Sequence, residues 1–175
     1  QSVTVRQTDV AGNVSAESSA LAFTLDTAAP TTSTITANDL SSPTGSSFSF
    51  TIPYADTGAG IDSASIGAGN VTVTGPAGVG ALTVSAASFG AGVATYTVDT
   101  PHSGAWSSAT DAGTYTIGIN GSSVKDLAGN VVAAAASAKT FAVSFNAAPV
   151  ITSSGSGSVA ENAAITTVVY ATVAT

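Results

Sequence analysis

The sequence predicts an all-β protein built of β-sandwich modules. Apolar residues recur at every second position in several short runs, as on a strand with one buried face. Asn, Gly, Pro and Asp punctuate these runs at the spacing of tight turns. Only 7% of the 175 residues are charged, and none of the runs has the period of an amphipathic helix. Together these observations favour strands throughout the chain.

The expected strands follow one another at short intervals. Phe48, Phe50 and Ile52 alternate on one face of a run, and Phe141, Val143 and Phe145 do so on another. Seven to nine strands in the central part indicate an immunoglobulin-like β-sandwich. The expected strands are 2–8, 20–25, 32–37, 46–53, 71–74, 81–86, 92–98, 114–119, 123–125, 130–134 and 139–145.

A turn of the form Asp-x-Ala-Gly-Asn occurs twice, at residues 9–13 and 126–130, which is a separation of 117 residues. Each copy is followed by a strand and then by an Ala-Ala-Pro segment, ending at Pro30 and Pro149. A near-constant period of this size indicates tandem modules. We therefore expect one complete module, residues 27–146, flanked by partial ones. Residues 1–26 would be the C-terminal hairpin of an upstream module, and residues 147–175 the first strands of a downstream module.

Composition narrows the classes of function. Three basic residues against ten acidic ones give a net charge of −7. This charge argues against binding nucleic acid, because its phosphate backbone requires clustered Lys and Arg. No apolar run approaches the roughly 20 residues of a membrane-spanning helix, so no membrane insertion is expected. The absence of cysteine excludes disulfides, thiolate metal sites and cysteine nucleophiles.

Several segments together resemble the tandem repeats of large secreted bacterial adhesins of the RTX type. The closing segment of residues 1–30 and the central stretch from Tyr54 to Asn130 look like bacterial Ig-like repeats. The segment from Ala148 through Val159-Ala-Glu-Asn162 resembles the opening of a cadherin-like repeat. The resemblance implies an extracellular location at the bacterial cell surface, and neighbouring modules of the same chain as the main partners.

The residues suggest a calcium loop between Asp56 and Asp62, where two carboxylates flank a Gly-rich turn. Ca²⁺ prefers six to eight oxygen ligands, which such a loop can bring together. The spacing is not that of an EF-hand. The alternative is a turn in which both carboxylates accept hydrogen bonds from backbone amides.

Acidic residues near the module ends are the second group of candidate Ca²⁺ ligands. Asp9 and Asp126 open the repeated turns, and Asp26 lies in the segment before Pro30. In the cadherin-like pattern the glutamate of the first-strand segment is implied to bind junction calcium, and Glu161 matches it. Asn146 stands where that pattern has an aspartate. The alternative for Asp126 is that it satisfies backbone groups within a turn.

No catalytic residues are expected. His102, with Ser103 and Asp99 or Asp111 nearby, lacks the nucleophile elbow of a hydrolase and is interpreted as a loop residue. Trp106, with Tyr54, Tyr96 and Tyr115, could form a carbohydrate platform, although a single Trp in a sandwich is usually part of the core.

The expected function is that of a structural spacer, or stalk, in an extracellular adhesin or matrix protein, stiffened by Ca²⁺. Two alternatives stay open. The longer loops could bind a glycan or a protein, or end strands could pair with copies of the same chain in a filament.

Overall fold

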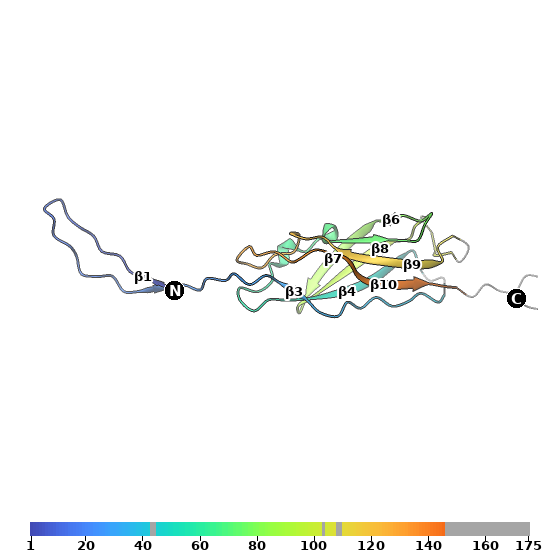
Figure 1. Cartoon of the computed structure of the whole chain (residues 1–175), viewed down its shortest axis with the longest axis horizontal. Helices are drawn as coiled ribbons and strands as arrows, with labels where there is room; N and C mark the ends of the chain where they lie inside the picture. Colours follow the sequence, from blue (N-terminus) through green and yellow to red (C-terminus); the bar gives the residue numbers. More distant parts are fainter. Residues whose placement is uncertain (43–44, 103, 108–109, 146–175) are drawn as a thin grey trace, which may run out of the picture.

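The computed structural model describes residues 1–42, 45–102, 104–107 and 110–145. It confirms the all-β prediction, because the elements in these ranges are strands and two short 3-10 turns. Two four-stranded antiparallel sheets face each other as a β-sandwich, and a separate two-stranded hairpin precedes them (Figure 1). The immunoglobulin-like topology stays a prediction.

Each sheet joins two pairs of consecutive strands that are distant from one another in the sequence. One has the order β3-β4-β8-β7 and the other the order β10-β9-β5-β6. The strands of the first are β3 (Thr31–Thr32), β4 (Ser47–Ala55), β8 (Val93–Asp99) and β7 (Val84–Gly90). The strands of the second are β10 (Ala135–Val143), β9 (Gly113–Ile119), β5 (Val71–Thr74) and β6 (Ala81–Leu82).

The core lies between the sheets, as the alternating runs predict. Phe48 of β4 stacks on Phe141 of β10, with ring centroids 4.3 Å apart. Tyr115 of β9 stacks on the same ring at 5.1 Å, and Trp106 packs edge-on against Tyr115. Trp106 is therefore a core residue.

One predicted strand is divided in the structure. The sequence predicts a single strand over 81–86, but β6 pairs with β5 in one sheet while β7 pairs with β8 in the other. The chain thus changes sheets near Thr83. Alternation along the sequence cannot reveal such a crossing, because the inward-facing side chains keep the same period on both sides of it.

The first strand of the sandwich also changes partner. After β3, Thr36 pairs with Thr51 of β4, and Leu40 then pairs with Val143 of β10 in parallel. The predicted strand 32–37 is therefore regular only at its start. The crossing joins the two sheets along one side of the sandwich.

The 3-10 turns η1 (Ser63–Ser65) and η2 (Ala68–Asn70) shape the loop between β4 and β5. Buried Asn70 anchors this loop: its Oδ1 accepts a hydrogen bond from the amide of Gly67 at 2.6 Å, and its Nδ2 donates one to the carbonyl of Ser65 at 3.1 Å. Burial raises the pKa of Tyr96, whose hydroxyl donates to the same Oδ1 at 3.4 Å. The loop that carries Asp56 is thus fixed to the core.

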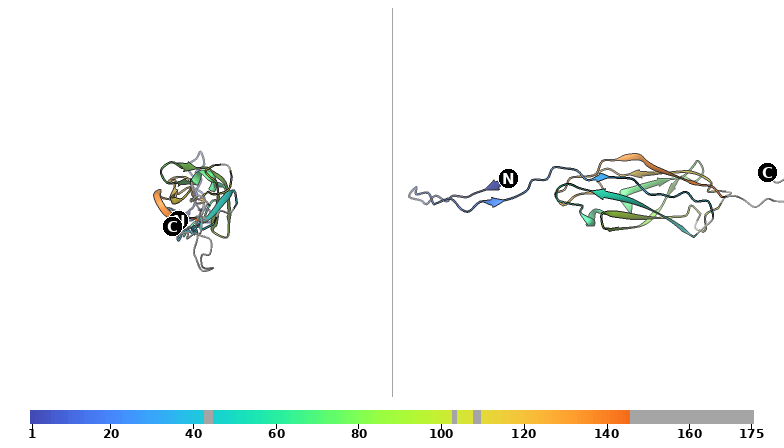
Figure 2. Two further views of the ribbon diagram at one scale, coloured as in Figure 1. Left: turned by 90° about the vertical axis from the view of Figure 1, so that its right-hand side faces the viewer. Right: turned by 90° about the horizontal axis from the view of Figure 1, so that it is seen from below.

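The hairpin of residues 1–25 lies beyond one end of the sandwich, roughly in line with its long axis (Figures 1 and 2). It contains β1 (Ser2–Val3) and β2 (Leu21–Ala22). Residues 26–30 connect it to the sandwich, and Pro30 is buried there. β10 points toward the opposite end, so the sandwich receives the chain at one end and releases it at the other.

Candidate metal centre

Three segments meet at the end of the sandwich that faces the hairpin. The loop after β4 and the repeated turn pair through Ile61 and Asp126, and the amide of Leu127 donates to the carbonyl of Gly60 at 2.9 Å. The connecting segment joins them through Asp26, whose carbonyl accepts a bond from Asn130 Nδ2 at 3.2 Å. Residues far apart in the sequence are thereby brought together.

Asp26, Asp56 and Asp126 converge at this junction. One carboxylate oxygen from each lies within 4.8 Å of those of the other two. In the part of the chain that the structure describes, the only ion pairs are Arg6–Glu17 and His102–Asp111. No basic side chain of those residues therefore neutralises the three carboxylates.

Asp56 offers the clearest sign of an unsatisfied ligand. Its Oδ2 accepts hydrogen bonds from the amides of Gly58 and Gly60, both at 2.9 Å. Its Oδ1 is buried and has no hydrogen-bond partner. A buried carboxylate oxygen without a partner is costly, so a cation at this position would satisfy it.

Asp26 is held at the cluster by backbone donors. The amide of Ala59 donates to its Oδ2 at 2.6 Å, and the amide of Ala28 to its Oδ1 at 2.9 Å. Gly58 leaves room for this carboxylate, since a Cβ built at Gly58 would lie 2.1 Å from Asp26 Oδ2. The absence of a side chain at Gly58 therefore permits Asp26 to reach the junction.

Asp126 is 2% exposed, and hydrogen bonds within the repeated turn hold its carboxylate in place. The backbone amide of Asn130 donates to its Oδ1 at 2.8 Å, and Asn130 Nδ2 to its Oδ2 at 2.7 Å. Burial alone raises the pKa of this carboxyl, but the bonds from Asn130 and the amides of Gly129 and Ala128 together hold it below the usual value. Asp126 is therefore anionic near neutral pH.

A pH dependence follows from the lowered pKa of Asp126. A carboxyl with a depressed folded-state pKa stabilises the fold above the unfolded pKa of about 3.9, and this contribution is lost as the pH falls through the folded pKa. In chelator we expect the melting temperature of Asp126→Asn to lie below that of the natural chain at pH 7 and to converge with it as the pH falls below about 3.9 and through the lowered folded-state pKa. Fluorescence of the single Trp, Trp106, monitors the sandwich selectively.

Asp9 provides the control for this pH dependence. It makes the same turn in the hairpin, and the bonds from Asn13 likewise lower its pKa. Asp9→Asn should leave the Trp106 melting curve unchanged at every pH. An offset between Asp126→Asn and the natural chain that does not shrink as the pH falls below about 3.9 would contradict the assignment.

The other predicted ligands lie elsewhere. Asp62 does not join Asp56, because its Oδ1 accepts the amide of Ala64 at 3.0 Å and caps η1. Asp9 is exposed at the tip of the hairpin. Glu161 and the rest of 147–175 lie outside the described residues. The sequence thus groups Asp56 with Asp62 and treats Asp26 and Asp126 as junction residues, whereas the structure brings Asp56 to the junction.

The donor set fits a hard cation. All three side chains offer carboxylate oxygens, and no nitrogen or sulfur ligand is present among the clustered residues. Ca²⁺ and Mg²⁺ prefer such ligands, and Ca²⁺ tolerates the irregular geometry of loops better than Mg²⁺ does. Asp26, Asp56 and Asp126 are therefore the residues that would hold Ca²⁺.

Asp111, an acidic residue outside this cluster, forms hydrogen bonds within the loop between β8 and β9. It is 1% exposed, and its Oδ1 lies 2.9 Å from His102 Nδ1. The amide of Ser107 donates to its Oδ2 at 2.7 Å. Ser103 lies outside the described residues. The His102–Asp111 pair ties the two ends of this loop together.

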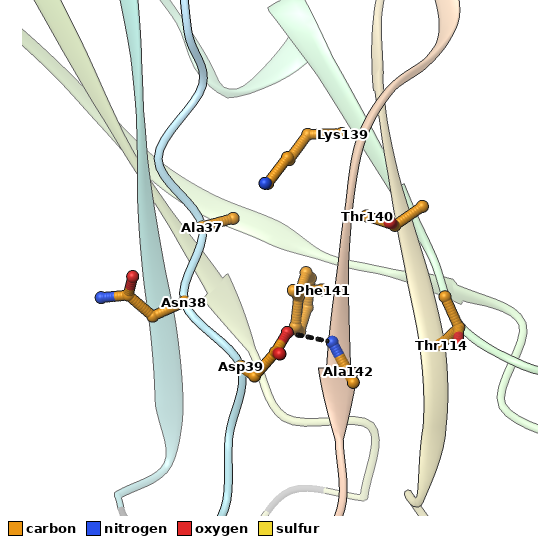
Figure 3. Close-up of a pocket in the computed structure, with 8 residues that line it drawn as sticks. All are labelled: Ala37, Asn38, Asp39, Thr114, Lys139, Thr140, Phe141 and Ala142. Carbon is orange, nitrogen blue, oxygen red and sulfur yellow. Dashed lines mark hydrogen bonds between the residues drawn. The ribbon is translucent and has the colours of Figure 1, made fainter.

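A groove of about 480 Å³ lies between residues 37–39, where the chain crosses from one sheet to the other, and β10 (Figure 3). Asp39 spans it, accepting a bond from the amide of Ala142 at 2.7 Å. Lys139 projects across it toward Ala37 (Figure 3). Among the residues that line the groove, Phe141 is the only aromatic one, and its ring is buried in the core and unavailable for stacking.

Comparisons with known proteins give limited likeness. No protein-family model matches the sequence, and a comparison with curated proteins finds no match either. Among solved structures, domains 1–6 of surface layer protein SbsC are 19% identical with a TM-score of 0.42, covering 70% of this chain and 14% of that one. The N-terminal part of the bacterial S-layer protein SbsC is 20% identical with a TM-score of 0.39, covering 70% and 25%.

This chain thus spans between a seventh and a quarter of those two chains. TM-scores below 0.5 do not establish a common fold or function. Within the described ranges, no helix has the length and apolarity needed to cross a membrane.

Proposed function

We propose that this chain is a spacer segment of a large extracellular bacterial surface protein, an adhesin or matrix protein, whose β-sandwich modules are stiffened by Ca²⁺ at their junctions. One observation carries the proposal: Asp26, from the segment between hairpin and sandwich, converges with Asp56 and Asp126 of the sandwich. A cation bound there would fix the direction in which the chain enters the module.

The arrangement suits a mechanical role. The sandwich takes in the chain at one end and releases it toward the other, so linked modules would extend end to end (Figure 1). The connecting segment is short, and without the cluster its orientation depends on few contacts. Clustered carboxylates repel one another without a cation and are drawn together by one. Stiffness would therefore depend on calcium outside the cell.

The alternative of a glycan-binding module has less support. Trp106 and the tyrosines 54, 96 and 115 are all buried, so they form no stacking platform. Neither is a catalytic role proposed, since His102 and Asp111 are accounted for by a loop contact.

The proposal is tested by measuring the distance between hairpin and sandwich in solution. The chain has no cysteine, so Ala16→Cys and Ser88→Cys introduce two unique sites for spin labels on exposed positions. We expect Ca²⁺ to narrow the distance distribution between the labels, as measured by double electron–electron resonance, because it fixes Asp26 to the sandwich.

Two further variants make this test specific. Asp26→Ala should keep the distribution broad with or without Ca²⁺. Asp62→Asn removes one negative charge from the same loop, but Asp62 lies outside the cluster. In this variant Ca²⁺ should narrow the distance distribution as much as in the parent. Equal widths in Ca²⁺ and in chelator for the parent would refute calcium stiffening of the junction.

A further inference from the structure

The loop that carries Asp56 and the turn that carries Asp126 are joined by a short antiparallel pairing. Residues 60–62 run beside residues 125–127, and Ile61 lies opposite Asp126 at the centre of the pairing. In a regular antiparallel ladder, the residue pairs on each side of such a centre exchange two backbone hydrogen bonds, one in each direction. Within these two described segments, each side has one backbone bond. Side chains take the place of the other two bonds.

On one side of the pairing, the second bond is made by the hydroxyl of Ser65. The amide of Asp62 donates to the carbonyl of Lys125 at 2.9 Å. For the return bond, Ser65 Oγ accepts the amide of Lys125 at 3.0 Å and donates to the carbonyl of Asp62 at 2.7 Å. The hydroxyl is thus inserted between the two segments and bonds to both of them.

On the other side, the second bond is made by Asp56. The amide of Leu127 donates to the carbonyl of Gly60 at 2.9 Å, but the amide of Gly60 donates to Asp56 Oδ2, also at 2.9 Å. This is the carboxylate whose Oδ1 is buried without a hydrogen-bond partner. The position of Asp56 therefore depends on where the pairing holds Gly60.

Ser65 is also fixed to the core of the sandwich. Asn70, which is 5% exposed, donates from its Nδ2 to the carbonyl of Ser65 at 3.1 Å. The hydroxyl of Tyr96 in β8 donates to Oδ1 of the same Asn70 at 3.4 Å. Because the backbone of Ser65 is held in this way, its hydroxyl loses little further conformational freedom when it joins the two segments.

We propose that Ser65 is a positioning residue of the cation site: its hydroxyl holds the loop against the turn, and so sets the separation of Asp56 and Asp126 and the affinity for Ca²⁺. This inference rests on the calcium-stiffened junction proposed above. It deepens that proposal, because it names a residue that controls the site without contacting the ion. Residues that orient metal ligands typically account for roughly 10–100-fold in metal affinity.

The test measures Ca²⁺ affinity by titration calorimetry in the parent chain and three variants. Ser65→Ala should weaken binding roughly 10-fold, because the amide of Lys125 and the carbonyl of Asp62 lose the group that joins them. Ser65→Thr keeps a hydroxyl on the same carbon and should restore the affinity of the parent. Ser63→Ala removes a hydroxyl from an exposed position of the same turn, η1, and should bind Ca²⁺ as the parent does.

Amide hydrogen exchange in chelator tests the pairing without a cation. In Ser65→Ala the amides of Asp62 and Leu127, which donate across the pairing, should exchange faster than in the parent. The amide of Thr51, which donates to Thr36 within the sandwich, should exchange at an unchanged rate. A general loss of stability would accelerate all three amides instead.

Three outcomes would overturn the positioning role. These are unchanged Ca²⁺ affinity in Ser65→Ala, an equal loss of affinity in Ser65→Thr, and faster exchange at all three amides. The calcium site itself still stands in these cases if the parent binds Ca²⁺ and Asp56→Asn does not. A parent chain that binds no Ca²⁺ would instead overturn the calcium junction and the positioning role together.

Discussion

Addition of Ca²⁺ should raise the melting temperature of the sandwich by roughly 10 °C, and Asp56→Asn should abolish this increase. A ligand present at 100 times its dissociation constant stabilises the state that binds it by about 2.7 kcal/mol. For a module of this size that corresponds to roughly 10 °C. Trp106 fluorescence in Ca²⁺ and in chelator measures the effect on the sandwich.

In chelator, Asp56→Asn should be more stable than the natural chain. Asp56 Oδ2 accepts two amide bonds, which an asparagine oxygen can also accept. The asparagine NH₂ would then replace Oδ1, the buried oxygen without a partner, and could donate to the neighbouring carboxylates of Asp26 and Asp126. Without Ca²⁺ we therefore expect Asp56→Asn to melt at a higher temperature than the natural chain.

Asp62→Asn is the matched control for Asp56→Asn. It makes the same chemical change in the same loop, but Asp62 caps η1 and lies outside the cluster. It should retain the full increase on adding Ca²⁺. If Asp62→Asn and Asp56→Asn lose the increase equally, the effect is one of net charge, and the three-carboxylate site is wrong.

The strands and turns could be predicted from the sequence where a local pattern alone determines them. Alternation identifies the inward residues of β4, β9 and β10, because each strand keeps one face on the core. The repeated Asp-x-Ala-Gly-Asn turn was predictable because its hydrogen bonds are local, between Asp126 and Asn130. The change of sheet at Thr83 was not, because it depends on which neighbours a strand finds in space.

The site shows the same division. Asp26, Asp56 and Asp126 each stand out in the sequence as acids in turns, but grouping them requires the pairing of Ile61 with Asp126 and the path of the connecting segment. Proximity in the sequence favours Asp62 as the partner of Asp56 instead. The local hydrogen bond to Ala64 takes Asp62 away from the cluster, in the manner of a capping residue.

Gly58→Ala should weaken Ca²⁺ binding while leaving every charge in place. A Cβ at Gly58 would lie 2.1 to 2.5 Å from the carboxylate atoms of Asp26, so the side chain of Asp26 must turn away and lose the amide of Ala59. Displacing a group that positions a ligand typically costs roughly 10–100-fold in metal affinity. Titration calorimetry with Ca²⁺ should show a loss of this size.

Gly69→Ala is the matched control, because a Cβ at Gly69 meets nothing within 4 Å and the affinity should not change. In chelator both variants should unfold within about 0.5 kcal/mol of the parent, because the clash at Gly58 involves the flexible end of one side chain. This comparison separates two explanations that carboxylate removal cannot separate. If Ca²⁺ were held only by the negative field of the module, Gly58→Ala would bind it as tightly as the parent; if Asp26 is a ligand, the affinity falls although the charge is unchanged.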